Sequence, residues 1–229
     1  MMWKNDRELF RLARQELFPA LLGDVLDKMG FLHQFLPQRL KPLDPEMVII
    51  GRAMPVLEAD VFGEKIENSS NSLMSMPFGL LFEALDQLKE NEVYICTGSS
   101  YGYALWGGLM SIRAQKVGAA GAVVDGYSRD TGEILHLGYP VFSAGTYAQD
   151  QGPRGKVIDY RVRIEIDNVG IEPGDIIFGD RDGVIIVPRT IETEAFEKAL
   201  EKARGEQRVK KALEEGMTTV DAFKTFGIM

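Results

Sequence analysis

A glycine pair, Gly107-Gly108, stands directly before a stretch with helical spacing at residues 109–117. The first N–H groups of a helix have no partner inside the helix, and together with the positive end of the helix dipole they suit an anion such as a carboxylate. We therefore expect backbone N–H groups to bind a substrate carboxylate here, contributed by Gly107, Gly108, Leu109 and Met110. The alternative is a tight turn that needs glycine only for unusual dihedral angles.

A basic and an acidic residue, Arg129 and Asp130, follow the next expected strand. Arginine holds a planar oxyanion through two parallel hydrogen bonds, and we expect Arg129 to neutralise the enolate oxygen that develops when a 2-oxo acid is cleaved. Asp130 offers the hard oxygen ligands that Mg²⁺ or Mn²⁺ prefers, so we expect it to bind the metal directly. The structural alternatives are an N-cap formed by Asp130, and an ion pair of Arg129 with a nearby acidic residue: Asp125, Asp130 or Glu133.

Four longer segments extend this pattern over nearly the whole chain. They are DVLDKMG (24–30), GAAGAVVDGYSRD (118–130), YPVFSAG (139–145) and GDIIFGDRDGVIIVP (174–188). In this order they resemble the RraA-like family, which includes class II pyruvate aldolases acting on 4-hydroxy-4-methyl-2-oxoglutarate or 4-carboxy-4-hydroxy-2-oxoadipate, and the regulator of ribonuclease E activity. The resemblance implies a swivelling β/β/α layered fold that assembles as homotrimers, often paired into hexamers, with sites between subunits.

The resemblance also implies a chemistry. It points to a divalent-metal-dependent carbon–carbon lyase that uses Mg²⁺ or Mn²⁺ and releases pyruvate from a 2-oxo acid through an enolate, as a 4-hydroxy-2-oxo acid aldolase, an oxaloacetate decarboxylase or both. By position, Glu206 matches a C-terminal glutamate that these aldolases donate to the metal-bound waters of a neighbouring subunit. The alternative for Glu206 is an ordinary charge on a solvated helix, with Lys210 as its partner one turn later.

One position departs from the family pattern. An acidic residue usually stands where this chain has Gly108, and it helps to organise the metal-bound waters that move protons. Retro-aldol cleavage needs a base for the 4-hydroxyl proton, whereas decarboxylation of oxaloacetate does not. We therefore expect decarboxylation to be the easier activity, and we expect Gly108→Asp or Gly108→Glu to raise aldol turnover.

Two other functions remain open. One is a non-catalytic regulator that binds a ribonuclease through an acidic surface, although the retained Arg129-Asp130 pair counts against it. The other is a lyase or hydratase for sugar-derived 2-oxo acids, with the polar, serine-rich loop at residues 58–76 helping to select the substrate.

Composition limits the classes of partner and compartment. The chain has 229 residues, 45% of them hydrophobic, and a formal net charge of −8, which argues against nucleic-acid binding because that needs a basic surface. Cys96 is the single cysteine, so an intrachain disulfide and a cysteine-based zinc site are excluded. We see neither a signal peptide nor a membrane-spanning run, and we expect a cytoplasmic protein.

These residues require a mixed α/β framework to position them. We expect a single domain of 1–229, with N-terminal helices in 1–30, an α/β core in 47–188 and a C-terminal helical arm in 190–229. Within the core, the expected strands cover 47–57, 93–97, 120–125, 140–144, 157–166, 176–178 and 184–187, and the expected helices 78–88 and 109–117. Three aromatic residues before the glycine pair line the pocket or simply pack: Tyr101, Tyr103 and Trp106.

Overall fold

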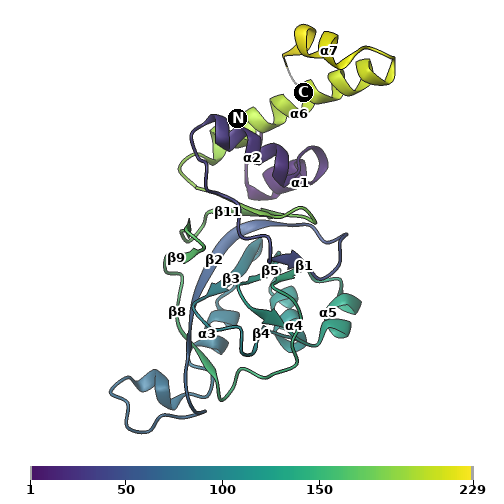
Figure 1. The fold of residues 1–229 in the computed structure, drawn as a ribbon. Coiled ribbons are helices and arrows are strands. Elements are labelled where there is room, and N and C mark those ends of the chain that lie inside the picture. The colour runs from purple at the N-terminus through teal and green to yellow at the C-terminus, as the bar shows by residue number, and fades with distance from the viewer. Residues whose placement is uncertain (1, 228–229) are drawn as a thin grey trace.

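The computed structural model describes residues 2–227, which form a layered α/β structure with both chain ends on the same side (Figure 1). The helices are α1 (Asp6–Glu16), α2 (Pro19–Lys28), α3 (Leu81–Asp86), α4 (Gly108–Lys116), α5 (Thr131–Leu137), α6 (Glu192–Glu214) and α7 (Thr219–Phe226), with a 3₁₀ turn η1 (Ser72–Ser75). No helix among these is both long and apolar enough to cross a bilayer.

The strands form one large sheet and two small ones. They are β1 (Lys41–Pro42), β2 (Ile49–Asp60), β3 (Glu92–Thr97), β4 (Ala104–Trp106), β5 (Gly121–Val124), β6 (Tyr127–Ser128), β7 (Val141–Ser143), β8 (Gly155–Tyr160), β9 (Ile164–Ile166), β10 (Val169–Ile171), β11 (Ile176–Gly179) and β12 (Val184–Val187). The large sheet has the order β1-β7-β5-β3-β2-β11-β12, and β8 pairs with β2. Strands β2, β3, β5 and β7 are parallel neighbours, so their carboxyl ends meet at one edge.

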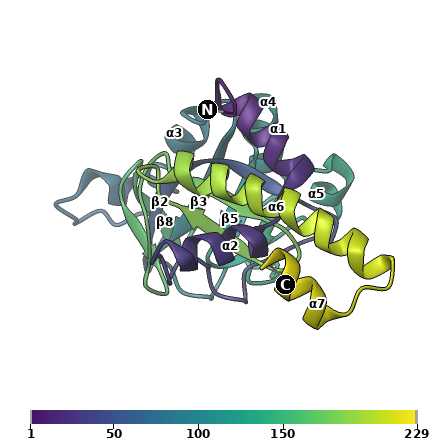
Figure 2. The ribbon, with the colours of Figure 1, turned by 90° about the horizontal axis from the view of Figure 1, so that it is seen from above.

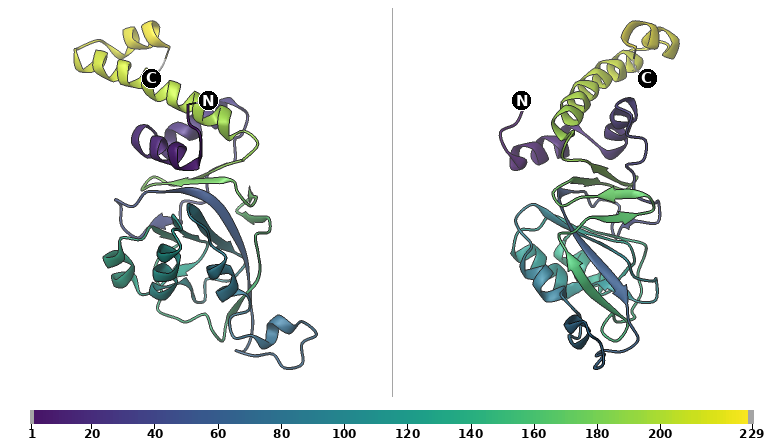
Figure 3. Two further views of the ribbon diagram at one scale, coloured as in Figure 1. Left: turned by 180° about the vertical axis from the view of Figure 1, so that it is seen from behind. Right: turned by 90° about the vertical axis from the view of Figure 1, so that its left-hand side faces the viewer.

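The sheet curls around an inner apolar core. Alternation along each strand sends Val93 and Ile177 to this inner core, while Tyr94 and Phe178, their sequence neighbours, face outward under helices. On one outer face lie α3, α4 and α5, and on the other lie α1, α2 and α6 (Figures 1 and 3). The middle strands are buried on both faces, which explains their unbroken apolar runs.

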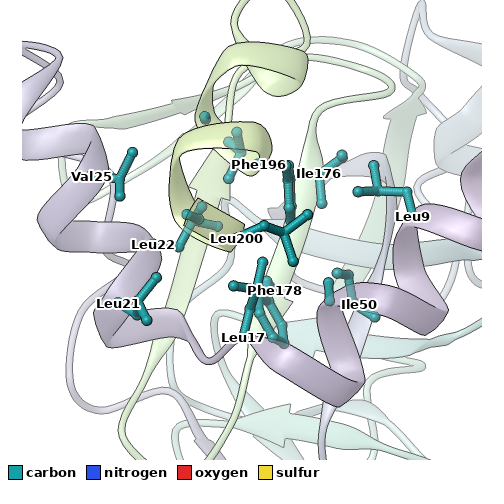
Figure 4. Packing of buried hydrophobic residues seen from close by; sticks show 14 of the residues in the cluster. Leu9, Leu17, Leu21, Leu22, Val25, Ile50, Ile176, Phe178, Phe196 and Leu200 are labelled. Carbon is teal, nitrogen blue, oxygen red and sulfur yellow. The ribbon is translucent and has the colours of Figure 1, made fainter. Parts of the chain in front are cut away.

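The two ends of the chain meet in one apolar cluster. Leu9 of α1, Leu22 of α2 and Leu200 of α6 pack over Ile176 and Phe178 of β11 (Figure 4), and the view from above shows α6 running across this face (Figure 2). A charged contact fixes the same junction.

Arg52 of β2 joins both ends electrostatically. Its guanidinium lies 2.6 Å from Asp6 Oδ1 and also pairs with Glu192, at the start of α6. Burial by itself would lower the pKa of the Arg52 guanidinium, but the hydrogen bonds that it donates to Asp6 and Glu192 raise this pKa above its usual range. The terminal helices are therefore anchored to the central sheet.

Most of the expected elements are confirmed, and two expectations were wrong in detail. The loop expected at 58–76 starts later, because β2 continues to Asp60 and buries Glu58 beside β8; the irregular segment runs from 61 to 80 and contains η1. The expected strand at 157–166 is broken into β8 and β9, because Arg161 adopts the left-handed conformation, with φ of 58°.

Candidate active site

The two halves of the candidate site lie side by side at the carboxyl edge of the parallel strands. Strand β4 leads into α4, strand β6 leads into α5, and the two strands pair in parallel with Trp106 opposite Ser128. The N–H of Arg129 donates to the Trp106 carbonyl at 2.9 Å. This pairing brings Gly107 against Arg129, as the sequence predicted.

Asp130 turns its carboxylate back towards the glycine pair. Its backbone is left-handed, with φ of 57° and ψ of 35°, and Oδ2 accepts a hydrogen bond of 3.1 Å from the N–H of Gly108. Asp130 does occupy the N-cap position of α5, but its side chain makes no capping bond there, so the N-cap alternative is wrong for the side chain. With 46% of the side chain exposed, Asp130 has room for further ligands.

Arg129 has a partner that the sequence did not suggest. Its Nη1 lies 2.9 Å from Oδ1 of Asp150, whereas Nε is 3.8 Å from Oδ2 of Asp130. Asp125, one of the partners considered, instead binds Thr97, Tyr101 and Arg39. The one sequence signal for Asp150 is the Asp-x-Gly pattern of residues 150–152, which is typical of an Asx turn. In the structure, Oδ2 of Asp150 accepts a hydrogen bond of 2.8 Å from the N–H of Gly152.

The glycine pair is required by close packing and not by unusual dihedral angles. Gly107 has an extended φ of −152°, so the alternative based on turn conformation is wrong for it. A Cβ on Gly107 would lie 2.9 Å from Oδ2 of Asp130, and one on Gly108 would lie 1.9 Å from Oε2 of Glu133. The glycines therefore let two carboxylates approach the start of α4.

The start of α4 retains free donors. The first intrahelical bond runs from the N–H of Ser111 to the Gly107 carbonyl at 3.1 Å. The N–H groups of Leu109 and Met110 come before that bond, so helix geometry leaves both without an intrahelical acceptor. Gly108 already donates to Asp130, so its N–H is not free for a substrate carboxylate, and binding of that carboxylate by Gly107, Leu109 and Met110 stays a prediction.

These groups border a pocket of about 260 Å³ with one polar and one apolar side. The polar side contains Arg129, Asp130, Asp150 and Gln151; the apolar side contains Phe78, Leu81, Phe82, Ala104, Leu105, Trp106, Leu109 and Met110. Of the three aromatic candidates, Trp106 lines the pocket, whereas the hydroxyl groups of Tyr101 and Tyr103 bind Asp125 and Asp60.

A buried carboxyl group lies directly behind the pocket wall. Glu58 is 2% exposed, and its Oε2 accepts a 2.7 Å hydrogen bond from Nε2 of Gln151. Burial raises the pKa of Glu58 to about 8, against the opposing effect of the hydrogen bond that it accepts from Gln151. From the sequence, Glu58 was expected in the polar loop, and its burial was not predicted.

Glu206 does not join this site within one chain. It lies on α6, where its carboxylate is 3.1 Å from Nζ of Lys202, one turn earlier and not one turn later at Lys210. Figure 3 shows α6 on the opposite side of the sheet from α4. Its role at a neighbouring subunit's metal stays a prediction.

The donor set fits a sparsely ligated hard cation. Within residues 2–227 no group of three or more His, Cys, Asp or Glu side chains is arranged to hold a metal. Mg²⁺ and Mn²⁺ do not need such a group, since one or two carboxylates, water and a chelating substrate complete an octahedron. Asp130 is the pocket carboxylate placed for this, because Asp150 is engaged by Arg129.

Comparison with known proteins gives a consistent family signal. A family model described as RraA-like, Aldolase/RraA, matches residues 20–186. Protein DlpA of Legionella pneumophila is 30% identical over 205 residues, which are 89% of this chain and 31% of that protein. A Halalkalibacterium halodurans protein named "Putative 4-hydroxy-4-methyl-2-oxoglutarate aldolase" is 33% identical over 110 residues, 48% of this chain and 52% of that protein. The chain thus spans about a third and about half of the lengths of these two curated relatives.

Solved structures agree on the architecture. An uncharacterized protein from Pseudomonas syringae pv. tomato is 25% identical and matches with a TM-score of 0.83 over 99% of this chain and 97% of its own. RraAS2 of Streptomyces coelicolor is described as an unusual member of the RNase ES inhibitor RraA protein family. It is 22% identical and matches with a TM-score of 0.75 over 91% of this chain and 98% of its own. The layered α/β fold expected from the resemblance is therefore confirmed.

Proposed function

The chain belongs to the RraA-like family, and we propose that it is a divalent-metal-dependent carbon–carbon lyase that cleaves a 2-oxo acid and releases pyruvate through an enolate. The observation that carries the proposal is the convergence of three groups on one pocket: the guanidinium of Arg129, the carboxylate of Asp130 and the free N–H groups at the start of α4. Relatives named as aldolases support a lyase at the level of the family.

The chain's own groups have separate tasks in this reaction. The N–H groups of Leu109 and Met110 bind the substrate carboxylate at the positive end of α4. Arg129 donates to the 2-oxo oxygen, which gains negative charge as the bond between C3 and C4 breaks. A donor aimed at developing charge contributes most in a pocket that excludes water, and the apolar wall of Phe78 and Trp106 provides that environment.

Asp130 would hold the cation. A bound Mg²⁺ or Mn²⁺ supplies Lewis-acid stabilisation of the oxygen that becomes the enolate oxygen. The hydrogen bond from Gly108 fixes Asp130 Oδ2, and this leaves Oδ1 for the metal. Because few protein ligands are involved, we expect weak metal binding.

The pocket also bears on the choice of substrate. Phe78 lies at the end of the irregular segment 61–80, and Leu81 and Phe82 continue the same wall into α3. The side of the substrate opposite the 2-oxo acid therefore meets an apolar surface in this chain. Segment 61–80 thus contributes to substrate selection through Phe78, two residues beyond the loop expected at 58–76, and selection of sugar-derived 2-oxo acids stays a prediction.

The decisive experiment measures pyruvate release from oxaloacetate and from 4-hydroxy-4-methyl-2-oxoglutarate, with and without Mg²⁺ or Mn²⁺. We expect metal-dependent release that falls by about 100-fold or more in Arg129→Ala and Asp130→Ala. Arg113→Ala is the matched control, because Arg113 forms a similar exposed pair with Asp86 at 2.8 Å on α4, away from the pocket.

Absence of release from both substrates with metal present would overturn the lyase proposal. The regulator alternative would then predict that the wild-type protein associates tightly with a ribonuclease in a binding assay. Both variants would retain that association if the pocket plays no part in it.

A further inference from the structure

Glu133 lies at the start of α4, although it belongs to α5. It is the third residue of α5, and its N–H bonds to the Asp130 carbonyl at 3.0 Å. Side chains on a helix point back towards its N-terminus, which directs Glu133 towards the glycine pair. Its Oε2 occupies the space where a side chain on residue 108 would begin, 1.9 Å from the position of a Cβ there.

The other carboxylates of the site are already engaged. Asp130 accepts from Gly108 and is the metal ligand of the proposed function, while Asp150 binds Arg129 through Oδ1 and the N–H of Gly152 through Oδ2. Within residues 2–227, the carboxylate of Glu133 has no hydrogen-bond or ion-pair partner. Glu133 does not itself line the pocket, but its Oε2 lies over Gly108, whose chain neighbours Gly107 and Leu109 do, and its carboxylate is free to accept a proton.

Aldol cleavage requires such an acceptor. The 4-hydroxyl group must lose its proton as the C3–C4 bond breaks, and the bonding electron pair passes to C3 to give the enolate of pyruvate. The enolate then takes a proton at C3, so the acid formed at the acceptor is returned to its carboxylate and no other reactant is needed. Decarboxylation of oxaloacetate breaks the same bond and has no hydroxyl proton to remove.

We infer that Glu133 is the proton-accepting carboxylate of aldol cleavage in this protein, placed over Gly108 by the N-terminal turn of α5. This inference rests on the proposed lyase function. It also changes one expectation from the sequence: the absence of an acidic residue at position 108 does not leave the site without a carboxylate at that place.

The test compares two reactions in one protein. Glu133→Gln keeps the size of the side chain and removes its basicity, so the ratio of aldol kcat to decarboxylase kcat should fall by about 100-fold or more, the usual contribution of a general base. Glu194→Gln is the matched control, because Glu194 is likewise an exposed third residue of a helix, on α6. In Glu194→Gln, the ratio of aldol kcat to decarboxylase kcat should stay within about twofold of the wild-type ratio.

A second pair of variants moves the carboxylate. Gly108→Ala should displace Glu133 and lower the same ratio, because the new Cβ cannot share space with Oε2. Gly108→Asp in the Glu133→Gln background returns a carboxylate from the other helix, and it should recover at least part of the lost aldol activity. Thermal unfolding midpoints show whether each variant is folded.

Metal binding provides a readout that does not depend on turnover. Titration with Mn²⁺, followed by electron paramagnetic resonance, should give a similar Kd for wild type and Glu133→Gln, and weaker binding for Asp130→Ala. Equal losses of aldol cleavage and decarboxylation in Glu133→Gln, or no loss of either, would overturn this inference and leave the lyase intact. A wild-type protein inactive on both substrates would overturn the lyase and this inference with it.

Discussion

Nη1 of Arg129 and Oδ1 of Asp150 lie 2.9 Å apart, across a pocket edge built from two separate loops. The backbone brings them together, because the N–H of Ala104 in β4 donates to the carbonyl of Gln149 at 2.9 Å. Asp150 therefore restrains the guanidinium from the side, without occupying the start of α4.

Neutralising Asp150 should misplace Arg129. We expect Asp150→Asn to lower kcat roughly tenfold on both substrates, since a small displacement of a group at the reacting centre is costly. Steady-state kinetics would show this, with Asp86→Asn as control, because its exposed pair with Arg113 should contribute little. Increased activity in Asp150→Asn would mean that Asp150 competes with the substrate for Arg129.

Removal of the metal should abolish activity and leave the fold intact. We expect EDTA to stop pyruvate release and excess Mg²⁺ or Mn²⁺ to restore it, while the unfolding midpoint changes by no more than about 2 °C, because weak ligands stabilise little. Activity assays and thermal denaturation on the same samples would check this. Activity that survives prolonged chelation would contradict the assignment of Asp130 as a metal ligand.

The buried carboxyl of Glu58 should make stability depend on pH. Burial raises the pKa of Glu58 to about 8, so between about pH 4.5 and pH 8 the folded state holds a proton that the unfolded state has lost. The free energy of unfolding should therefore fall as pH rises through this window. Relative to wild type, Glu58→Gln should gain on the order of a few kcal/mol from pH 5 to pH 8.

Urea denaturation at several pH values measures this difference, with the exposed Glu67→Gln as control. A difference between Glu58→Gln and wild type that stays constant with pH would show that Glu58 is ionised in the folded state.

Lys156 should hold the irregular segment 61–80 against the sheet. Its buried Nζ donates to the carbonyls of Glu64 at 2.6 Å and Pro77 at 3.0 Å, and also to Met76. We expect Lys156→Met to lower the free energy of unfolding by about 2–4 kcal/mol, because buried carbonyls would lose their donor. The exposed Lys65→Met is the control in urea denaturation, and equal stabilities of the two variants would contradict this role.

The parts of the fold that could be predicted are those set by local pattern. The apolar runs at 93–97 and 120–125 are each followed by a glycine, Gly98 and Gly126, and are buried on both faces, so the local pattern predicts strands there. The glycine pair was recognisable because it stands directly before a helical pattern. The Arg129-Asp130 pair was recognisable because the two side chains are charged and follow an apolar run.

The missed features depend on contacts between distant segments. Glu58 looked like part of a polar loop, and its burial follows only from the pairing of β2 with β8. Asp150 meets Arg129 because a loop returns beside β4, and Glu133 meets Gly108 because α5 starts from a left-handed residue. No local spacing encodes these approaches.

The packing of α1 and α2 against α6, beside the ion pairs of Arg52, determines the order in which parts of the fold can form during synthesis. Helices α1 and α2 are made first, yet their apolar faces pack against α6, which follows roughly 160 residues later. At about 5–20 residues per second, those faces wait on the order of ten to thirty seconds for their partner. The strands and helices around the pocket are all complete before α6 leaves the ribosome, so the pocket half can form while the terminal layer remains open.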